Sequence, residues 1–148
     1  MRRGDSGVKN TMTNLSGTLE DRIEIRELYA RYCQLVDHSR YDEWLDCFTD
    51  DGVFESTRYG RHAGRDALEK FTHTYRESLG GARVVHLAHN LLMKIEKERG
   101  SGYCDFTYYH RKDGKIQQET IGFYTDVLRK IDHGWRFASR CQTILGWR

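Results

Sequence analysis

At 148 residues the chain is long enough for one domain with a buried core and a pocket, and too short for a second domain. Lys and Arg total 24 against 22 Asp and Glu, and because the two signs are interspersed, no basic run marks a nucleic-acid surface. No apolar run approaches the roughly 20 residues of a membrane span, and the amino terminus lacks the apolar segment of a secretory signal. We therefore expect a cytoplasmic protein that binds neither nucleic acid nor membrane.

The chain should begin with a flexible segment and continue as one domain. Residues 1–18 are polar, rich in Gly and Ser, and without periodicity, which predicts a mobile tail. The single domain is expected over residues 19–148. From Glu20 the apolar residues recur at steps of three and four, which predicts a helix that ends near Asp37.

Two more helices and one short strand are expected in the first half of the chain. A second helix is predicted over residues 41–48, and the Thr-Asp-Asp-Gly sequence at 49–52 supplies the turn chemistry that stops it. A strand follows at 53–56, and two glycines bracket a turn at 60–64. A third helix is predicted over 68–79, where a Gly-Gly pair ends it.

The second half of the chain has the pattern of β-strands. Four stretches at 83–97, 102–111, 115–131 and 135–145 are rich in β-branched and aromatic residues, and Gly-containing turns separate them. Such a meander buries one face by curling around the helices. We therefore predict an α+β fold in which a cone-shaped, curved antiparallel sheet wraps around the N-terminal helices and encloses a cavity, although other helix-then-sheet folds share this order.

No metal or cofactor is expected. The cysteines stand far apart in apolar surroundings, which favours buried free thiols over disulfides or metal ligands. Because side chains alternate along a strand, His86 and Asn90 should share one face, while His89, Leu91 and Met93 share the other. Two ligands on one strand need even spacing, so His86 and His89 do not predict a metal pair.

Three segments resemble the SnoaL-like proteins of the nuclear transport factor 2-like superfamily. They are IRELYARYCQLVDHSRYDEWLDCFTDDGVFE, VVHLAHN and GFYTDVLRKIDHGWRF, within about residues 20–145. The nearest-looking enzymes are bile acid 7α-dehydratase, hexachlorocyclohexane dehydrochlorinase and scytalone dehydratase. The resemblance implies the same cone fold and an elimination reaction that needs no cofactor.

The resemblance also implies catalytic residues. Asp37 and His86 match a catalytic Asp and His of the first two enzymes, and Tyr32 matches an active-site Tyr of the bile acid dehydratase. An Asp that accepts the ring N–H of a His fixes its tautomer and leaves the other nitrogen free as a base. Tyr32 can donate to developing charge or to a leaving hydroxyl. Tyr32 and Asp37 can face one pocket only if the helix ends there.

Substrate-binding roles are expected for Asn90, Tyr124 and His110. The last of these matches a second active-site His of scytalone dehydratase, but a gapless alignment puts Arg40 where that enzyme has its acid. His110 stands beside a turn, so it is equally expected to be solvated at a strand end.

Structural roles remain open for all of these residues. Asp37 can bind backbone amides at the helix end, and His86 can be a hydrogen-bonded core residue. Tyr32 stands at core spacing on its helix. Asp126 and Arg140 fit a sheet held by cross-strand pairs.

The sequence predicts a cofactor-independent lyase, of the dehydratase or dehydrohalogenase type, or a related isomerase. Its substrate is expected to be a hydrophobic ring compound such as a polyketide, steroid or terpenoid. The alternative is a non-catalytic small subunit similar to the β subunit of ring-hydroxylating dioxygenases. The resemblance also implies a homo-oligomer, either a trimer or a dimer.

Overall fold

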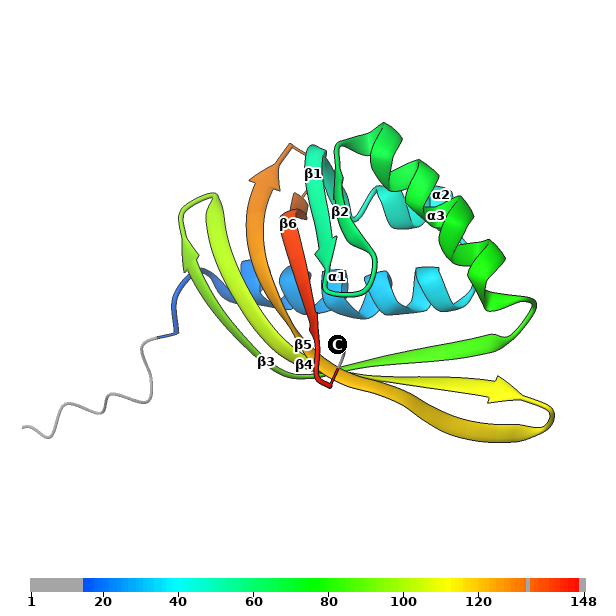
Figure 1. The fold of residues 1–148 in the computed structure, drawn as a ribbon. Coiled ribbons are helices and arrows are strands. Elements are labelled where there is room, and N and C mark those ends of the chain that lie inside the picture. The colour runs from blue at the N-terminus through cyan, green and yellow to red at the C-terminus, as the bar shows by residue number, and fades with distance from the viewer. Residues whose placement is uncertain (1–14, 133, 147–148) are drawn as a thin grey trace, which may run out of the picture.

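The computed structural model describes residues 15–132 and 134–146. Three helices and six strands follow one another along the chain. They are α1 (Leu19–Asp37), α2 (Tyr41–Leu45), β1 (Phe48–Ser56), β2 (Gly60–Ala63), α3 (Arg65–Leu79), β3 (Arg83–Glu96), β4 (Arg99–Lys112), β5 (Lys115–Ile131) and β6 (Gly134–Ile144). The sheet curves strongly, α1 crosses its concave side, and α2 and α3 lie near β1 and β2 (Figure 1). The predicted α+β class is confirmed.

The sheet is mixed, which corrects the prediction of an antiparallel one. Its strand order is β2-β1-β6-β5-β4-β3, and β1 runs parallel to β6 while the other neighbours are antiparallel. The β1–β2 hairpin therefore joins the edge of the meander formed by the last strand of the chain. Sequence order does not encode this choice, because the paired residues Phe54 and Arg140 lie far apart in the chain.

The region between α2 and β1 also differs from the prediction. The second helix ends at Leu45 instead of residue 48, and the predicted turn at 49–52 is an irregular stretch inside β1. A Cβ on Gly52 would lie 2.8 Å from Cβ of Phe48 and 3.2 Å from the carbonyl oxygen of Phe137. Gly52 thus lets the bent strand pass close to β6. The predicted turn at 60–64 contains strand β2.

The start of α1 is held by a network around Asp21. Thr18 and Asp21 form a capping box, in which each side chain binds the backbone N–H of the other. Lys130 Nζ and Trp135 Nε1 also donate to Asp21, at 2.7 and 2.8 Å. These two bonds lower the pKa of Asp21, and the Lys130 bond has the larger effect. Burial alone would raise this pKa, but the bonds outweigh it. Most of the predicted tail, residues 1–14, lies outside the described residues.

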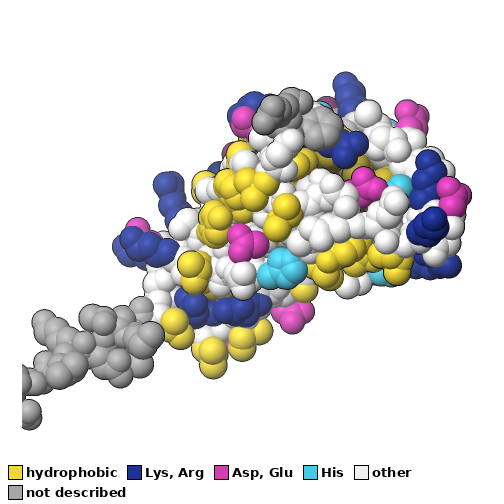
Figure 2. Space-filling model, turned by 60° about the horizontal axis from the view of Figure 1, so that its bottom comes forward, with side chains coloured by type: hydrophobic (Ala, Val, Ile, Leu, Met, Phe, Trp, Pro, Cys, Tyr) yellow, Lys and Arg dark blue, Asp and Glu magenta, His cyan; other side chains and the backbone are white. Residues whose placement is uncertain are grey.

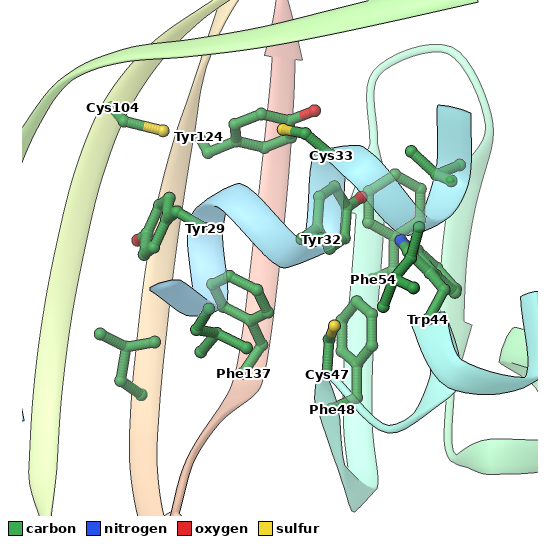
Figure 3. Packing of buried hydrophobic residues seen from close by; sticks show 14 of the residues in the cluster. Tyr29, Tyr32, Cys33, Trp44, Cys47, Phe48, Phe54, Cys104, Tyr124 and Phe137 are labelled. Carbon is green, nitrogen blue, oxygen red and sulfur yellow. The ribbon is translucent and has the colours of Figure 1, made fainter. Parts of the chain in front are cut away.

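The core is an aromatic cluster between α1 and the sheet. α1 contributes Tyr29 and Tyr32, whose rings pack on rings from the sheet and from α2 (Figure 3). The other labelled rings are Trp44, Phe48, Phe54, Tyr124 and Phe137. The four cysteines, all in the described part of the chain, are free thiols, and only Cys141 is not fully buried.

A buried ion pair sits inside this cluster. Arg140 is fully buried, and its Nε and Nη2 donate to the two carboxylate oxygens of Asp126 at 2.9 Å each. The hydroxyl of Tyr29 donates to the same carboxylate. The guanidinium lies 3.9 Å from the ring centre of Tyr124 and 4.2 Å from that of Tyr32, which are cation–π distances. The sequence placed Asp126 and Arg140 among the residues of cross-strand pairs, and the structure pairs them with each other.

The outer face of the sheet carries exposed apolar side chains. On β3, β4 and β5 these are Val85, Leu87, Leu92, Tyr103, Ile116, Ile121, Val127 and Ile131, between 37% and 74% exposed. Figure 2 shows hydrophobic side chains gathered in several groups across the underside of the molecule. Among the described residues, no helix is both long and apolar enough to cross a membrane.

Candidate active site

The structure brings Asp37 and His86 together. Asp37 is the last residue of α1, and His86 lies on β3. The ring Nδ1 of His86 is 2.5 Å from Oδ1 of Asp37, and the backbone N–H of His86 donates to Oδ2 at 2.9 Å. Each side chain is 9% exposed. One carboxylate therefore holds both the ring and the backbone of the same residue.

The position of Asp37 at the end of α1 has an electrostatic cost. The C-terminal end of a helix carries partial negative charge, and a carboxylate there is unfavourable by about 0.3–1 kcal/mol. The last turn of α1 contains no basic residue to offset it. The carboxylate binds β3, 49 residues further along the chain, instead of amides of its own helix end. The structure therefore does not show Asp37 binding backbone amides at the end of its own helix.

One ring nitrogen of His86, Nδ1, is hydrogen-bonded to Asp37, and the other, Nε2, is not. With the carboxylate accepting from Nδ1–H, a neutral imidazole carries its lone pair on Nε2. The His86 ring lines a cavity and lies 4.7 Å from the ring of Tyr108, its cross-strand partner on β4. Asp37 binds the ring of His86 but does not itself line the cavity. This arrangement can accept a proton from a molecule bound inside.

The cavity lies between α1, α2, α3 and the concave face of the sheet. Its space is about 500 Å³ including the open mouth. The walls are mostly aromatic: Tyr32, Trp44, Phe54, Tyr59, Phe71, Tyr75, Phe106, Tyr108 and Tyr124. Besides the tyrosine hydroxyls and the indole N–H, the polar side chains are few, namely Arg58, His86, Thr120 and Gln142. Walls made largely of aromatic rings suit a ligand that itself contains a ring.

Tyr32 and Tyr124 line this cavity as expected. Both rings pack against the buried guanidinium of Arg140 on one side. Tyr124 also accepts a bond from Nε2 of Gln142 at 3.3 Å. Burial raises the pKa of both phenols, the nearby cation only partly opposing this, so both remain protonated donors at neutral pH. Because α1 ends at Asp37, Tyr32 reaches the same cavity as His86.

Asn90 is not brought into the cavity. It has a φ of 54° in a β-bulge, where the register between β3 and β4 shifts, and its side chain donates to Asp105 at 2.9 Å on the exposed side. The bulge also reverses the alternation that the sequence predicted. Leu91 and Met93 pack against the core, on the side of His86.

His110 lies beside the cavity rather than in it. It lines an adjoining hollow that shares Arg58, Tyr59 and Tyr108 with the cavity. Its Nδ1 is 3.1 Å from Oε1 of Glu119, and its side chain is 20% exposed. The chain thus contains a second His–carboxylate pair, more exposed than the first.

Several cavity residues were missed by the sequence analysis. Trp44 and Tyr75 were expected only as apolar positions of helices, and Tyr108 only as a strand residue. Strand pairing offers one signal, since Tyr108 faces His86 across the β3–β4 hairpin. Burial raises the pKa of Tyr108 to about 12, with Tyr75 partly opposing. Within 15–132 and 134–146, no group of three His, Cys, Asp or Glu residues is placed to hold a metal.

The fold and the cavity are those of a cystatin-like cone. Residues 17–141 match the SnoaL-like domain family, and the chain belongs to this family. No curated protein sequence matches the chain.

Solved structures share the fold at low sequence identity. An NTF2-like protein with a cystatin-like fold from Novosphingobium aromaticivorans is 24% identical, with a TM-score of 0.80 over 88% of this chain and 85% of that one. A variant of a function-unknown protein from Mycobacterium tuberculosis is 26% identical, with a TM-score of 0.77 over 86% and 76%. A Catenulispora acidiphila protein in complex with S-DNPA is 21% identical, with a TM-score of 0.76 over 83% and 92%.

Proposed function

We propose that the protein is a cofactor-independent lyase or isomerase acting on a hydrophobic ring compound, with His86 as the proton-abstracting base. The observation that carries the proposal is the Asp37–His86 pair at the wall of an aromatic cavity. Aromatic walls with a few polar groups are typical of sites for small apolar ligands. The similar Catenulispora protein in complex with S-DNPA supports a small molecule as the ligand.

Elimination and isomerisation share their first step. A proton leaves a carbon that an adjacent carbonyl acidifies, and the base must lie within hydrogen-bond reach of that proton. Asp37 orients the ring of His86 and stabilises the imidazolium that forms. Tyr32 is the candidate proton donor to a leaving hydroxyl, because its own hydroxyl is protonated and its ring lines the cavity. The aromatic walls keep bulk water from the reacting atoms.

Deuterium exchange tests this first step without knowledge of the natural substrate. We expect the protein to accelerate exchange at the acidic carbon of a ring ketone such as 1-tetralone in D2O, followed by NMR. His86→Gln should lower the protein-dependent rate of deuterium exchange by a factor of about 10² to 10⁴. His110→Gln is the matched control, because it removes the other carboxylate-paired histidine. If His86→Gln exchanges as fast as the wild type, His86 is not the base.

The second candidate is a non-catalytic subunit, and the apolar outer face of the sheet favours it. Contiguous exposed apolar patches often mark contact surfaces for other proteins. The same face suits a homo-oligomer, a trimer or a dimer, whichever function holds. No exchange with any ring ketone in a broad panel, together with an unoccupied cavity in binding assays, would favour the subunit over the enzyme.

A further inference from the structure

Two hydrogen-bond donors in the cavity wall have no partner. The indole Nε1 of Trp44 and the hydroxyl of Tyr75 are buried, and neither forms a hydrogen bond within the described residues. Trp44 is 1% exposed and Tyr75 is 5% exposed. Two other buried atoms share this state, on Tyr41 and Arg140, but those residues do not line the cavity. Buried polar groups are almost always paired, so an unpaired donor in a cavity wall indicates a partner that arrives with a ligand.

The chemistry of these donors defines what the partner must offer. An indole N–H can only donate, so the partner of Trp44 must be an acceptor. Burial, and next the neighbouring Tyr108, raise the pKa of Tyr75, which keeps its hydroxyl protonated. The Tyr108 hydroxyl lies close enough to act on this pKa, but the two hydroxyls do not have the geometry of a full hydrogen bond. Both donors are neutral. A carboxylate would lose its hydration in this apolar wall, and a neutral donor cannot offset that cost, so a carbonyl or ether oxygen is the better match.

The surroundings of Trp44 define the shape of the partner. Its ring lies 5.4 Å from the ring of Tyr32, 4.9 Å from that of Phe48 and 6.1 Å from that of Phe71. These three ring pairs are tilted, with interplanar angles of 47°, 60° and 42°, and such an aromatic wall suits a further ring in the cavity beside it. An oxygen-free hydrocarbon would occupy the cavity but leave both donors unpaired.

We propose that Trp44 and Tyr75 are specificity-determining residues, and that the ligand of the cavity is a ring ketone or a related ring compound with neutral acceptor oxygens bound by these two donors. The inference rests on the proposed function only for the location of the site. In the first step, the C–H bond breaks, the proton moves to Nε2 of His86, and the electron pair forms an enolate with its charge on the carbonyl oxygen. In an elimination this pair then returns to form the C=C bond and expels the leaving group with its bonding electrons. A donor on that oxygen binds it more strongly as the charge develops.

The test uses two probes that differ only in the acceptor. Acetophenone and α-methylstyrene have nearly the same shape, but the first has a carbonyl oxygen where the second has a methylene group. Binding is measured by ¹H–¹⁵N NMR titration, with the indole N–H signal of Trp44 assigned through Trp44→Phe. We expect the wild type to bind the ketone about two- to tenfold more tightly, the range of ratios that one net hydrogen bond supplies.

The variants remove the donors and keep the rings. Trp44→Phe or Tyr75→Phe, whichever donor holds the carbonyl, should abolish the preference, and the double variant should bind both probes equally. Each should keep the melting temperature of the wild type or exceed it, because an unpaired buried donor is removed. Trp135→Phe is the control, since its indole N–H is already bonded to Asp21 and lies outside the cavity lining.

Three outcomes would overturn the inference: equal affinity for both probes in the wild type, a preference that survives in the double variant, or binding of neither probe. The proposed function has a separate readout, the effect of His86→Gln on deuterium exchange. A loss of exchange in that variant together with an unchanged probe preference in the double variant would retain the base and reject these donors. The reverse pattern would retain a ketone-binding site that has no catalytic base.

Discussion

Two of the buried carboxylates among the described residues, Asp126 and Asp37, each bind a basic side chain that is itself buried, and the two pairs differ in whether the base keeps an unbound nitrogen. Asp126 is 1% exposed and Arg140 is fully buried, and two guanidinium nitrogens bind the two carboxylate oxygens. Asp37 and His86 are each 9% exposed, and only one of the two imidazole nitrogens is bound to the carboxylate. The first pair is closed inside the core, whereas the second opens on the cavity.

The comparison separates structural from chemical uses of buried charge. The guanidinium of Arg140 keeps its charge under all conditions in a protein, so its pair with Asp126 can only hold strands and rings in place. The imidazole of His86 has a second ring nitrogen that the carboxylate does not bind, and it can change tautomer. Similar burial therefore stabilises the fold in one pair and, in the other, is compatible with the proton transfer that we propose.

The largest effect is expected from breaking the closed pair. Asp126→Asn leaves the guanidinium of Arg140 buried without a countercharge, which should destabilise the fold by about 3–5 kcal/mol. Urea unfolding followed by circular dichroism measures this change. Asp105→Asn is the matched control on β4, where the carboxylate faces outward and binds only Asn90 among the described residues. A loss below 1 kcal/mol in Asp126→Asn would show that the core does not depend on the pair.

The two pairs were not equally visible in the sequence. Asp126 and Arg140 lie on the neighbouring strands β5 and β6, and the strand pattern suggested that each takes part in a cross-strand pair, without identifying its partner. The meeting of Asp37 and His86, 49 residues apart, came from the resemblance to a family and not from periodicity. Periodicity and Gly-containing turns did predict β3 to β6 to within a few residues, because each strand is long and amphipathic or aromatic.

What the sequence could not predict depends on long-range contacts. The bulge at Asn90 changed which residues of β3 face the core, and any of several polar residues could have taken that conformation. The parallel pairing of β1 with β6 joins segments that no local pattern relates. The spacing of Trp44 and Tyr75 on their helices predicts that they are buried. It does not predict that their polar atoms lack a hydrogen-bond partner, because that depends on which side chains the fold brings near them.

A third buried carboxylate, Asp21, provides an intermediate case. Lys130 and Trp135 donate to it and lower its pKa, but Lys130 is largely exposed to solvent. Because the folded-state pKa is lowered, Asp21 stabilises the fold above its unperturbed value of 3.8, and this contribution is lost as the pH falls below that value. We expect Asp21→Asn to be less stable than the wild type at pH 7, by less than Asp126→Asn is, because solvent screens the Lys130 contact.

The measurement is urea unfolding of both proteins at several pH values. The stability difference between Asp21→Asn and the wild type should be constant from pH 7 to 5 and shrink on the way to pH 3. Lys130→Met separates the ion pair from the helix cap, since it leaves the Thr18 contacts intact. A difference that stays the same at pH 3 would mean that the carboxylate is not the group that stabilises α1.

The smallest effect on stability is expected at the open pair. In Asp37→Asn the amide oxygen can still accept from the backbone N–H of His86, and the amide nitrogen can donate to Nδ1 if the ring moves its proton to Nε2. Removing the carboxylate also relieves its unfavourable position at the end of α1. We therefore expect a loss of less than about 1 kcal/mol, because no buried group is left without a partner. Arg140 has no such alternative when Asp126 is replaced.

The same tautomer change should abolish the chemistry of the open pair. With the proton on Nε2, the nitrogen that faces the cavity becomes a donor and can no longer act as a base. Asp37→Asn should therefore slow deuterium exchange of a ring ketone by about 10² to 10⁴ while leaving the melting temperature nearly unchanged. Glu119→Gln, which alters the partner of His110 in the same way, should change neither. If Asp37→Asn keeps the wild-type exchange rate, Asp37 only anchors β3. If it loses several kcal/mol of stability, the Asp37–His86 pair is structural, like the pair of Asp126 and Arg140.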